Sequence, residues 1–236
     1  MDKVKYLFTN DTIVFKGVCL RRIRSLKDMN SDFDGSIKTG ELGGWIESEE
    51  NLSHDGLCWV DSEAKVYGDA RITGDARVTD HAVVCGRAVV SGEALVAGRA
   101  RVRDHASISG LAKIDGKQVL IAGHAKVGDY AQVQGSASVT GEAQLGDCAS
   151  VSQMAVVTGR TKITGHAQIS GAARIQNKAT ISGRAQVRGH ATIRGRAMVC
   201  DAAVVEGGIV VAGAVVVGGN AVLTGSDMLL GSARIG

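Results

Sequence analysis

The sequence of 236 residues contains no proline and very few aromatic residues: three Phe, two Trp and three Tyr. With so few aromatic side chains, a hydrophobic core has to be built from Val, Ile, Leu and Ala. No apolar run approaches the roughly 20 residues of a membrane-spanning helix, and the first residues lack the apolar stretch of a signal peptide. We therefore expect a soluble, cytoplasmic protein that does not associate with a membrane.

Cysteine is also sparse, and its spacing excludes two common structural devices. The five cysteines are odd in number and contain no Cys-x-x-Cys pair, so neither a disulfide framework nor a zinc ribbon is expected. With 44% hydrophobic and 22% charged residues, the composition is that of a folded chain rather than a disordered one. We expect no resident metal ion.

Glycine, by contrast, is abundant, with 32 residues, and it belongs to a repeat of six residues. Alanine occupies every sixth position from Ala64 to Ala112, and an aliphatic residue follows two positions after each alanine. The register slips by one residue within 116–120, and the aliphatic repeat then continues to Ile235. A repeat of this length decides the fold before any other signal is considered.

A period of six fits neither an α-helix nor a flat strand, but it fits a short strand followed by a corner. The small residue and the aliphatic residue, two positions apart, point to the same side of such a strand. The Gly or Asp that follows tolerates the positive φ of a tight corner. Three such edges close a triangular coil of about 18 residues, and successive coils stack about 4.8 Å apart. The repeat therefore predicts an all-β fold, a parallel β-helix of about nine coils.

The hexad, an aliphatic residue followed four positions later by a small one, covers about 64–236 and resembles the hexapeptide repeat of left-handed parallel β-helix proteins. Many bacterial acyltransferases have this fold, and the resemblance implies the left hand. The segments 43–46 (Gly-Gly-Trp-Ile) and 58–60 (Cys-Trp-Val) are similar to those of YdcK-type enterobacterial proteins and related prophage proteins. In that group a small N-terminal cap precedes the hexads, and the label of acetyltransferase follows largely from the fold, which is a weak guide to function.

The segment before the repeat is different and holds most of the aromatic residues. Short runs of β-forming residues on either side of Asn10-Asp11 are typical of strands joined by tight turns. Because the first coil would otherwise expose an unpaired edge, we expect a small N-terminal β cap over 1–50, followed by the parallel β-helix over 51–236. Both tryptophans are then expected to be packing residues.

The net charge of +3 hides a strong asymmetry along the chain. Residues 1–63 carry eight Lys/Arg and twelve Asp/Glu, whereas residues 148–200 carry eight Lys/Arg and no Asp/Glu. Residues one coil apart stack on the same corner of the predicted helix, and one such row is almost entirely basic: Arg87, His105, His124, Glu142, Arg160, Lys178 and Arg196.

This row supports two interpretations. In the first, a bound anion offsets the repulsion between stacked like charges; the anion is a polyanion, a phosphorylated ligand or the acidic surface of a partner. In the second, the long side chains fan out in solvent and salt screens them. Nucleic acid is the weaker choice of anion, because no aromatic residue is interleaved for base stacking.

The resemblance implies a second functional hypothesis, acyl transfer from acetyl-CoA or another acyl-CoA, with a histidine as general base at a site between subunits. His105 and His124 lie on adjacent predicted coils beside the register slip and are the candidate bases. Against this, no long loop interrupts the hexads to form the wall of a pocket. Stacked residues also form a line and do not converge on one point as metal ligands must.

The last coils are apolar on the outside as well as the inside. The position before each inward aliphatic residue is often Lys or Arg in earlier coils, whereas here it is apolar: Val204, Val210, Val216, Val222 and Met228. The sequence also ends at Ile235-Gly236 without a helix or a charged tail, and bare edges and apolar surface both favour association. We expect a homo-oligomer, either a side-by-side trimer or an end-to-end dimer, unless these positions simply tolerate apolar residues.

The sequence therefore favours a non-catalytic, self-associating β-helix of the prophage-linked kind, which presents a basic corner to an acidic macromolecular partner and needs no cofactor. The alternative is a hexapeptide-repeat acyltransferase with an acetyl-CoA-type donor and His124 or His105 as the base. A donor-sized pocket between subunits would separate the two hypotheses.

Overall fold

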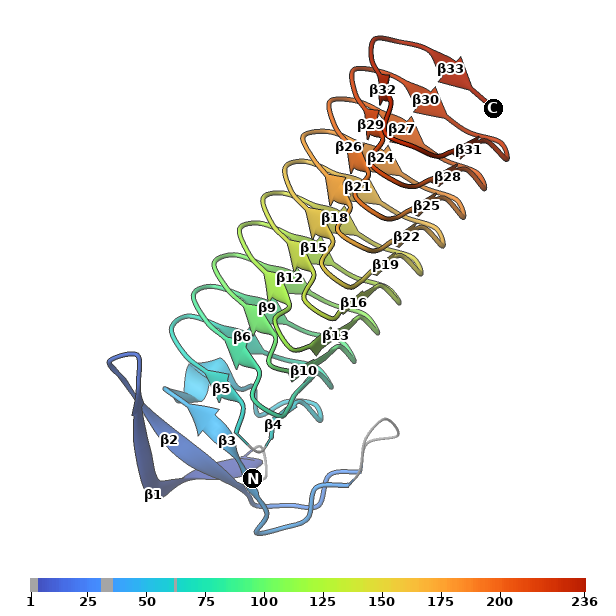
Figure 1. Cartoon of the computed structure of the whole chain (residues 1–236). Coiled ribbons are helices and arrows are strands. Elements are labelled where there is room, and N and C mark those ends of the chain that lie inside the picture. Colours follow the sequence, from blue (N-terminus) through green and yellow to red (C-terminus); the bar gives the residue numbers. More distant parts are fainter. Residues whose placement is uncertain (1–3, 31–35, 62) are drawn as a thin grey trace.

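A computed structural model describes residues 4–30, 36–61 and 63–236 of the chain. Within these residues the chain is almost entirely strand and corner, with a single 3-10 turn, η1 (Glu49–Asn51). Three sheets form the faces of a prism whose coils rise from the N-terminal hairpin to the last strands (Figure 1). The predicted fold class, an all-β parallel β-helix with a small N-terminal β cap, is confirmed.

The three sheets are named here in the order in which each coil visits them. Sheet I has 13 strands: β1 (Tyr6–Phe15), β2 (Val18–Ser25), β3 (Leu42–Ile46), β5 (Lys65–Val66), β8 (Val83–Val84), β11 (Arg101–Val102), β14 (Leu120–Ile121), β17 (Ser138–Val139), β20 (Val156–Val157), β23 (Arg174–Ile175), β26 (Thr192–Ile193), β29 (Val210–Val211) and β32 (Met228–Leu229). Sheet II has 10 strands: β6 (Arg71–Ile72), β9 (Val89–Val90), β12 (Ser107–Ile108), β15 (Lys126–Val127), β18 (Gln144–Leu145), β21 (Lys162–Ile163), β24 (Thr180–Ile181), β27 (Met198–Val199), β30 (Val216–Val217) and β33 (Arg234–Ile235). Sheet III also has 10 strands: β4 (Trp59–Val60), β7 (Arg77–Val78), β10 (Leu95–Gly98), β13 (Lys113–Gly116), β16 (Gln132–Gln134), β19 (Ser150–Val151), β22 (Gln168–Ile169), β25 (Gln186–Val187), β28 (Val204–Val205) and β31 (Val222–Leu223).

Each strand of the prism pairs in parallel with the equivalent strand of the next coil. Val66 lies opposite Val84, 18 residues further along the chain. Val102 lies opposite Ile121, 19 residues further along, because the extra residue of the register slip lies between them. The slip falls at the corner between sheets III and I, and all three sheets continue past it. The predicted coil length and slip are therefore confirmed.

The interior consists of the small and aliphatic positions of the repeat. Ala106 and Ile108, for example, are fully buried, and the buried core continues in this way as far as Val217. The absence of proline follows from the same arrangement, because strand N–H groups donate to the coil above. The N–H of Ser107, for example, donates to the carbonyl of Ala125 at 2.9 Å.

Corners use positive φ angles, as the Gly and Asp positions predicted, and the aspartates add a second function. Asp80 has a φ of 56°, and its carboxylate accepts the backbone N–H of Gly98, one coil further, at 2.8 Å. Asp104 and Gly123 repeat the arrangement at 3.0 Å. These carboxylates join successive coils at the corner, a role that the sequence pattern did not predict.

The N-terminal hairpin is continuous with sheet I. β2 pairs antiparallel with β3, and β3 pairs parallel with β5, so parallel pairing starts one coil before the alanine repeat begins. Leu52 adds an isolated parallel bridge to Ile72, and β4 pairs with β7. The turn expected at Asn10-Asp11 is instead an irregularity inside one continuous strand, β1.

Aromatic side chains close this end of the core. Tyr6 is buried and lies edge-on to Trp59, with ring centroids 6.3 Å apart. Trp59 is fully buried and Trp45 is only 7% exposed. This burial agrees with the packing role expected for both tryptophans.

Two buried polar side chains replace missing backbone contacts in the first coil. The Asn51 amide donates to the carbonyls of Gly68 (2.8 Å) and Ala70 (2.9 Å) in the coil above. The Lys5 ammonium donates to the carbonyl oxygen of Cys58 at 2.7 Å and lies 3.0 Å from its sulfur. Burial lowers the pKa of Lys5, and the neighbouring Cys58 opposes this shift. Both side chains tie the non-repeating segment to the prism.

Candidate functional site

The predicted basic row lies along the corner between sheets I and II. The backbone of each member is bonded to the next coil in the same way: the N–H of His105 donates to the Gly123 carbonyl, and that of His124 donates to the Gly141 carbonyl. The structure therefore places the residues predicted for this row one above another on the same corner: Arg87, His105, His124, Glu142, Arg160, Lys178 and Arg196.

Carboxylates balance the N-terminal half of this row. Asp69 precedes Arg87 by one coil, and its Oδ2 lies 3.4 Å from the Arg87 Nε. Glu142 follows the histidines, and its Oε2 lies 2.9 Å from the Arg160 Nε. Within residues 69–142 of the row, the charges thus alternate in sign around two histidines.

The two histidine rings of the row are stacked face to face. Their centroids are 4.7 Å apart and their planes differ by 18°. Both His105 and His124 are exposed side chains, so neither ring is enclosed with a reacting group. This arrangement gives a flat, aromatic and basic step on the corner. His105 also borders an open hollow of about 350 Å³ together with Asp69, Arg87 and Asp104.

The C-terminal half of the row is wider than predicted. Arg174 lies in β23 and Arg194 directly follows β26 on the sheet I side of the corner, and Lys162 lies in β21 on the sheet II side. All are exposed. Together with the corner they form the basic patch, defined as Arg160, Lys162, Arg174, Lys178, Arg194 and Arg196. Following the corner alone did not predict the three flanking residues, Lys162, Arg174 and Arg194. All three belong to residues 148–200, the acid-free segment, which contains no Asp or Glu.

Charge in the basic patch is almost uncompensated. Within the described residues only Arg160 of the six has a carboxylate partner, Glu142, and residues 148–200 contain no Asp or Glu. Unit charges one coil apart, about 4.8 Å, repel by about 1 kcal/mol in bulk water and by more near a protein surface. A multivalent anion bound across the patch would remove that repulsion.

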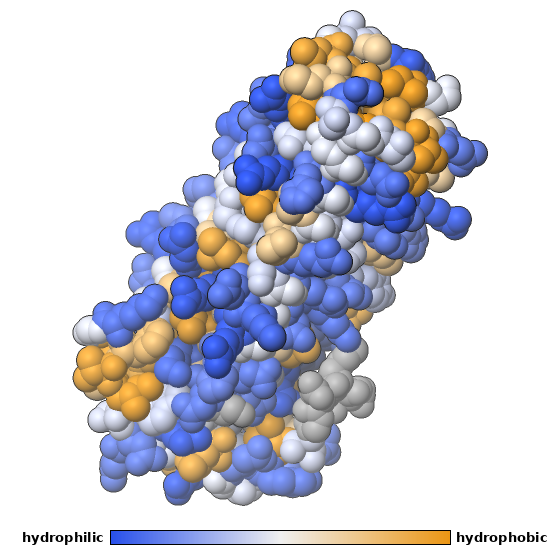
Figure 2. Space-filling model, in the orientation of Figure 1, coloured by the Kyte–Doolittle hydropathy of each residue, from blue (hydrophilic) through white to orange (hydrophobic). Residues whose placement is uncertain are grey.

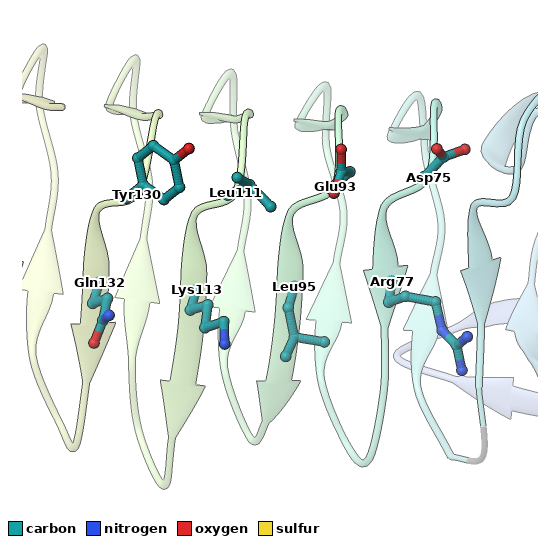
Figure 3. Close-up of a pocket in the computed structure, with 8 residues that line it drawn as sticks. All are labelled: Asp75, Arg77, Glu93, Leu95, Leu111, Lys113, Tyr130 and Gln132. Carbon is teal, nitrogen blue, oxygen red and sulfur yellow. The ribbon is translucent and has the colours of Figure 1, made fainter. Parts of the chain in front are cut away.

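A separate groove of about 480 Å³ runs along sheet III beside its corner with sheet II (Figure 3). Arg77, at one end, is 7% exposed and pairs with Asp61. The groove lies between corner and strand side chains that contain no Ser, Cys or His: Asp75, Glu93, Leu111 and Tyr130 in one row, and Arg77, Leu95, Lys113 and Gln132 in the other. The lining therefore has no imidazole, and the groove does not extend the hypothesis of a histidine-based acyltransferase.

The five apolar residues predicted as an oligomer interface lie on all three faces. Val204 and Val222 belong to sheet III, Val210 and Met228 to sheet I, and Val216 to sheet II. Val222 is 63% exposed and Met228 is 57% exposed. Apolar surface gathers around the last coils, whereas much of the middle of the prism is hydrophilic on the face in view (Figure 2). The five residues therefore surround the end of the prism and do not form one lateral patch.

Two further expectations concern sites outside the basic patch. Within the described residues, no three His, Cys, Asp or Glu side chains are close enough together to hold a metal ion. No helix in that part of the chain is long and apolar enough to cross a membrane.

Comparison with known proteins adds no family. No family model matches the chain, and no curated protein is significantly similar to it. The parallel β-helix therefore stands on the structure itself, and the similarity to YdcK-type proteins remains a hypothesis drawn from the hexads and the Gly-Gly-Trp segment.

Proposed function

We propose that the protein is a non-catalytic β-helical scaffold whose basic patch binds an acidic macromolecular partner. The observation that carries this proposal is the charge of the patch: six exposed cations surround one corner over three coils, and only Arg160 among them has a carboxylate partner in the described residues. Such a surface attracts anions from a distance and holds several of their charges at once.

An acidic protein surface suits the patch better than a nucleic acid. The sequence contains no aromatic residue after Tyr130, so the patch offers no ring on which a base stacks. The coils are also joined by regular backbone hydrogen bonds, so the cations are carried on a rigid frame. A carboxylate-rich segment laid along the corner would pair with them in sequence.

Self-association is the second part of this proposal. Val222, Met228 and Leu230 are large apolar side chains that are each more than half exposed in the last coils, and such patches favour association. Their distribution around the prism favours an end-to-end dimer over a side-by-side trimer. Two copies would present two basic patches and bind a long partner by avidity.

The anion-binding proposal is tested with fluorescence anisotropy of labelled polyglutamate. The triple variant R174Q/K178Q/R194Q is expected to weaken binding about tenfold or more, a loss of roughly 1.4 kcal/mol. The variant K113Q/K126Q/R184Q removes three exposed cations outside the patch and is the matched control, with at most a twofold loss expected. An equal loss in both variants would show that only net charge matters and would overturn the proposal.

A titration with acetyl-CoA separates the scaffold from the acyltransferase alternative. Saturable binding that disappears in H124A or H105A would make the enzyme the better explanation. Heat with acetyl-CoA that is absent, or that is unchanged in H124A and H105A, is the result expected for a scaffold, together with polyglutamate binding.

Light scattering tests the self-association. The wild-type chain is expected to show a dimer mass at micromolar concentration, and V222K/M228K is expected to show a monomer. Met154 is 64% exposed but lies in the middle of the prism, so M154K is the control that should leave the mass unchanged. A monomeric wild type would remove this part of the proposal.

A further inference from the structure

A hollow of about 290 Å³ lies on sheet I at the N-terminal end, far along the prism from the basic patch. The tip of the β1–β2 hairpin, which lies beside β5 (Figure 1), forms one side of it. We name it the hairpin hollow, lined by Phe15, Lys65, His81, Val83, Arg99 and Arg101. We infer that the hairpin hollow binds a nucleotide, with the phosphates on its arginines and lysine and the base against Phe15.

The strand register places two cations on opposite sides of an apolar floor. Val83 in β8 lies directly opposite Lys65 in β5 and opposite Arg101 in β11. The two cations are therefore two coils apart, about 10 Å, with the valine side chain between them. Arg99 and His81 stand one coil apart on the corner between sheets III and I. Positive groups thus border the hollow on three sides.

The Lys65 ammonium donates at 2.7 Å to a neutral acceptor, the backbone carbonyl of Glu63, which leaves its charge uncompensated. Within the described residues, none of Lys65, Arg99 and Arg101 forms an ion pair with a carboxylate. Glu63 and Asp80 line an adjoining hollow with His81 and Arg99. The Glu63 carboxylate accepts the indole N–H of Trp45 at 3.4 Å, and the Asp80 carboxylate accepts a backbone N–H at its corner. Three such cations around one hollow favour an anion with several charges, as in a di- or triphosphate.

The Phe15 ring forms the fourth side of the hollow and packs against Tyr67. The Phe15 ring lies edge-on to Tyr67, with centroids 6.0 Å apart, and the Lys65 ammonium lies 5.4 Å from its centre. An aromatic ring beside phosphate-binding cations suits a flat heterocycle joined to phosphates, because the base stacks while the phosphates pair. The volume of about 290 Å³ is close to the lower limit of roughly 300 Å³ for small-molecule sites and suits a mononucleotide.

Calorimetric titration of the full chain with ATP, tripolyphosphate and adenosine tests the inference. ATP is expected to bind with one site per chain, and tripolyphosphate more weakly because it lacks the base. R99Q/R101Q is expected to weaken ATP binding about tenfold or more. K126Q/R184Q removes the same charge from exposed residues outside both the hairpin hollow and the basic patch and is expected to leave ATP binding unchanged.

The ring contact has its own variant. F15A is expected to weaken ATP binding several-fold without changing tripolyphosphate binding, and circular dichroism confirms that the hairpin is retained. Should F15A disturb the hairpin, K65Q tests the same hollow from the rigid sheet. No heat with millimolar ATP, or an equal loss in R99Q/R101Q and K126Q/R184Q, would overturn the site. Equal affinity for ATP and tripolyphosphate would overturn the assignment of the ligand as a nucleotide.

Discussion

The two halves of the prism share one interior but differ in their surfaces. Val78 in the first half and Ile181 in the second occupy the same inward position and are both fully buried. Residues 64–147 carry ten Lys/Arg and nine Asp/Glu, whereas residues 148–200 carry eight Lys/Arg and no acid. The backbone and the core of residues 148–200 are therefore built like those of residues 64–147, although no carboxylate lies on the surface of about three coils in residues 148–200.

This difference teaches that the acid-free surface is not a by-product of the fold. In the first half, corner aspartates such as Asp80, Asp104 and Asp129 accept an N–H from the next coil. In the acid-free segment, Gln153 makes the equivalent bond with its amide oxygen, and most other corners are glycine. Residues 148–200 therefore lack the corner carboxylate that returns directly after them at Asp201, and the basic patch lies in this segment.

The largest loss of stability is expected in the core, where the two halves of the prism are alike. In I181D an unpaired carboxylate would replace a fully buried side chain, which is expected to cost more than about 4 kcal/mol and to unfold the surrounding coils. Thermal unfolding followed by circular dichroism measures this loss. T180D places the same charge on the adjacent outward residue of β24, and a shift as large as that of I181D would contradict the inward and outward assignment.

A smaller loss of stability is expected when a corner glycine is replaced. Gly171 has a φ of +70°, and an added Cβ would lie 2.7 Å from the backbone of Gly189 in the next coil. G171A is therefore expected to lower the free energy of unfolding by about 1–3 kcal/mol. An added Cβ at Gly208 would come no closer than 3.7 Å to another atom, so G208A is the control. Equal stability of the two variants in urea would show that corners tolerate side chains.

The corner carboxylates are tested at the boundary between the halves. Asp147 has a φ of 51°, and its carboxylate accepts the N–H of Gly165 at 2.8 Å. D147G relieves the positive φ and removes the acceptor, so a loss of about 1 kcal/mol is expected from the missing hydrogen bond. D147N keeps an acceptor oxygen and should lose less. A D147G protein as stable as the wild type would mean that the carboxylate's hydrogen bond contributes no more stability than the positive φ of Asp147 costs.

The sequence predicted the prism well because each inward position of the repeat is decided locally. The pairing of Val66 with Val84, and the stacking of His105 on His124, both follow from counting residues. Residues 1–63 contain no repeat from which contacts could be predicted by counting residues. The position of Phe15 over Lys65 depends on how the hairpin packs against the first coils, which no local pattern specifies.

Some residues of the candidate site were likewise predicted from the spacing, and others were found only in the structure. Corner members of the basic patch, such as Lys178, were predicted from the spacing. Arg174 and Arg194 were missed because stacking was followed along one corner and not across the adjoining sheet. The sequence did not predict the hairpin hollow, because Phe15 and Arg101 come together only through tertiary packing.

The smallest expected effect is a pH dependence in the first half. Burial, followed by a hydrogen bond with Cys85, raises the pKa of Tyr67 to about 12. The unfolded chain, with a tyrosine pKa near 10, loses this proton first, so unfolding releases a proton between pH 10 and 12. The stability that Tyr67 contributes is therefore complete below pH 10 and lost as the pH rises through that window.

Y67F removes this ionisation and is expected to flatten the fall in melting temperature between pH 9.5 and 11.5. Because the side chain is partly exposed, the difference in free energy of unfolding should stay below about 1 kcal/mol. Tyr130 is 60% exposed, so Y130F is the control and should follow the wild-type curve. If Y67F also follows that curve, the phenol beside the hairpin hollow is no better shielded from water than an exposed tyrosine.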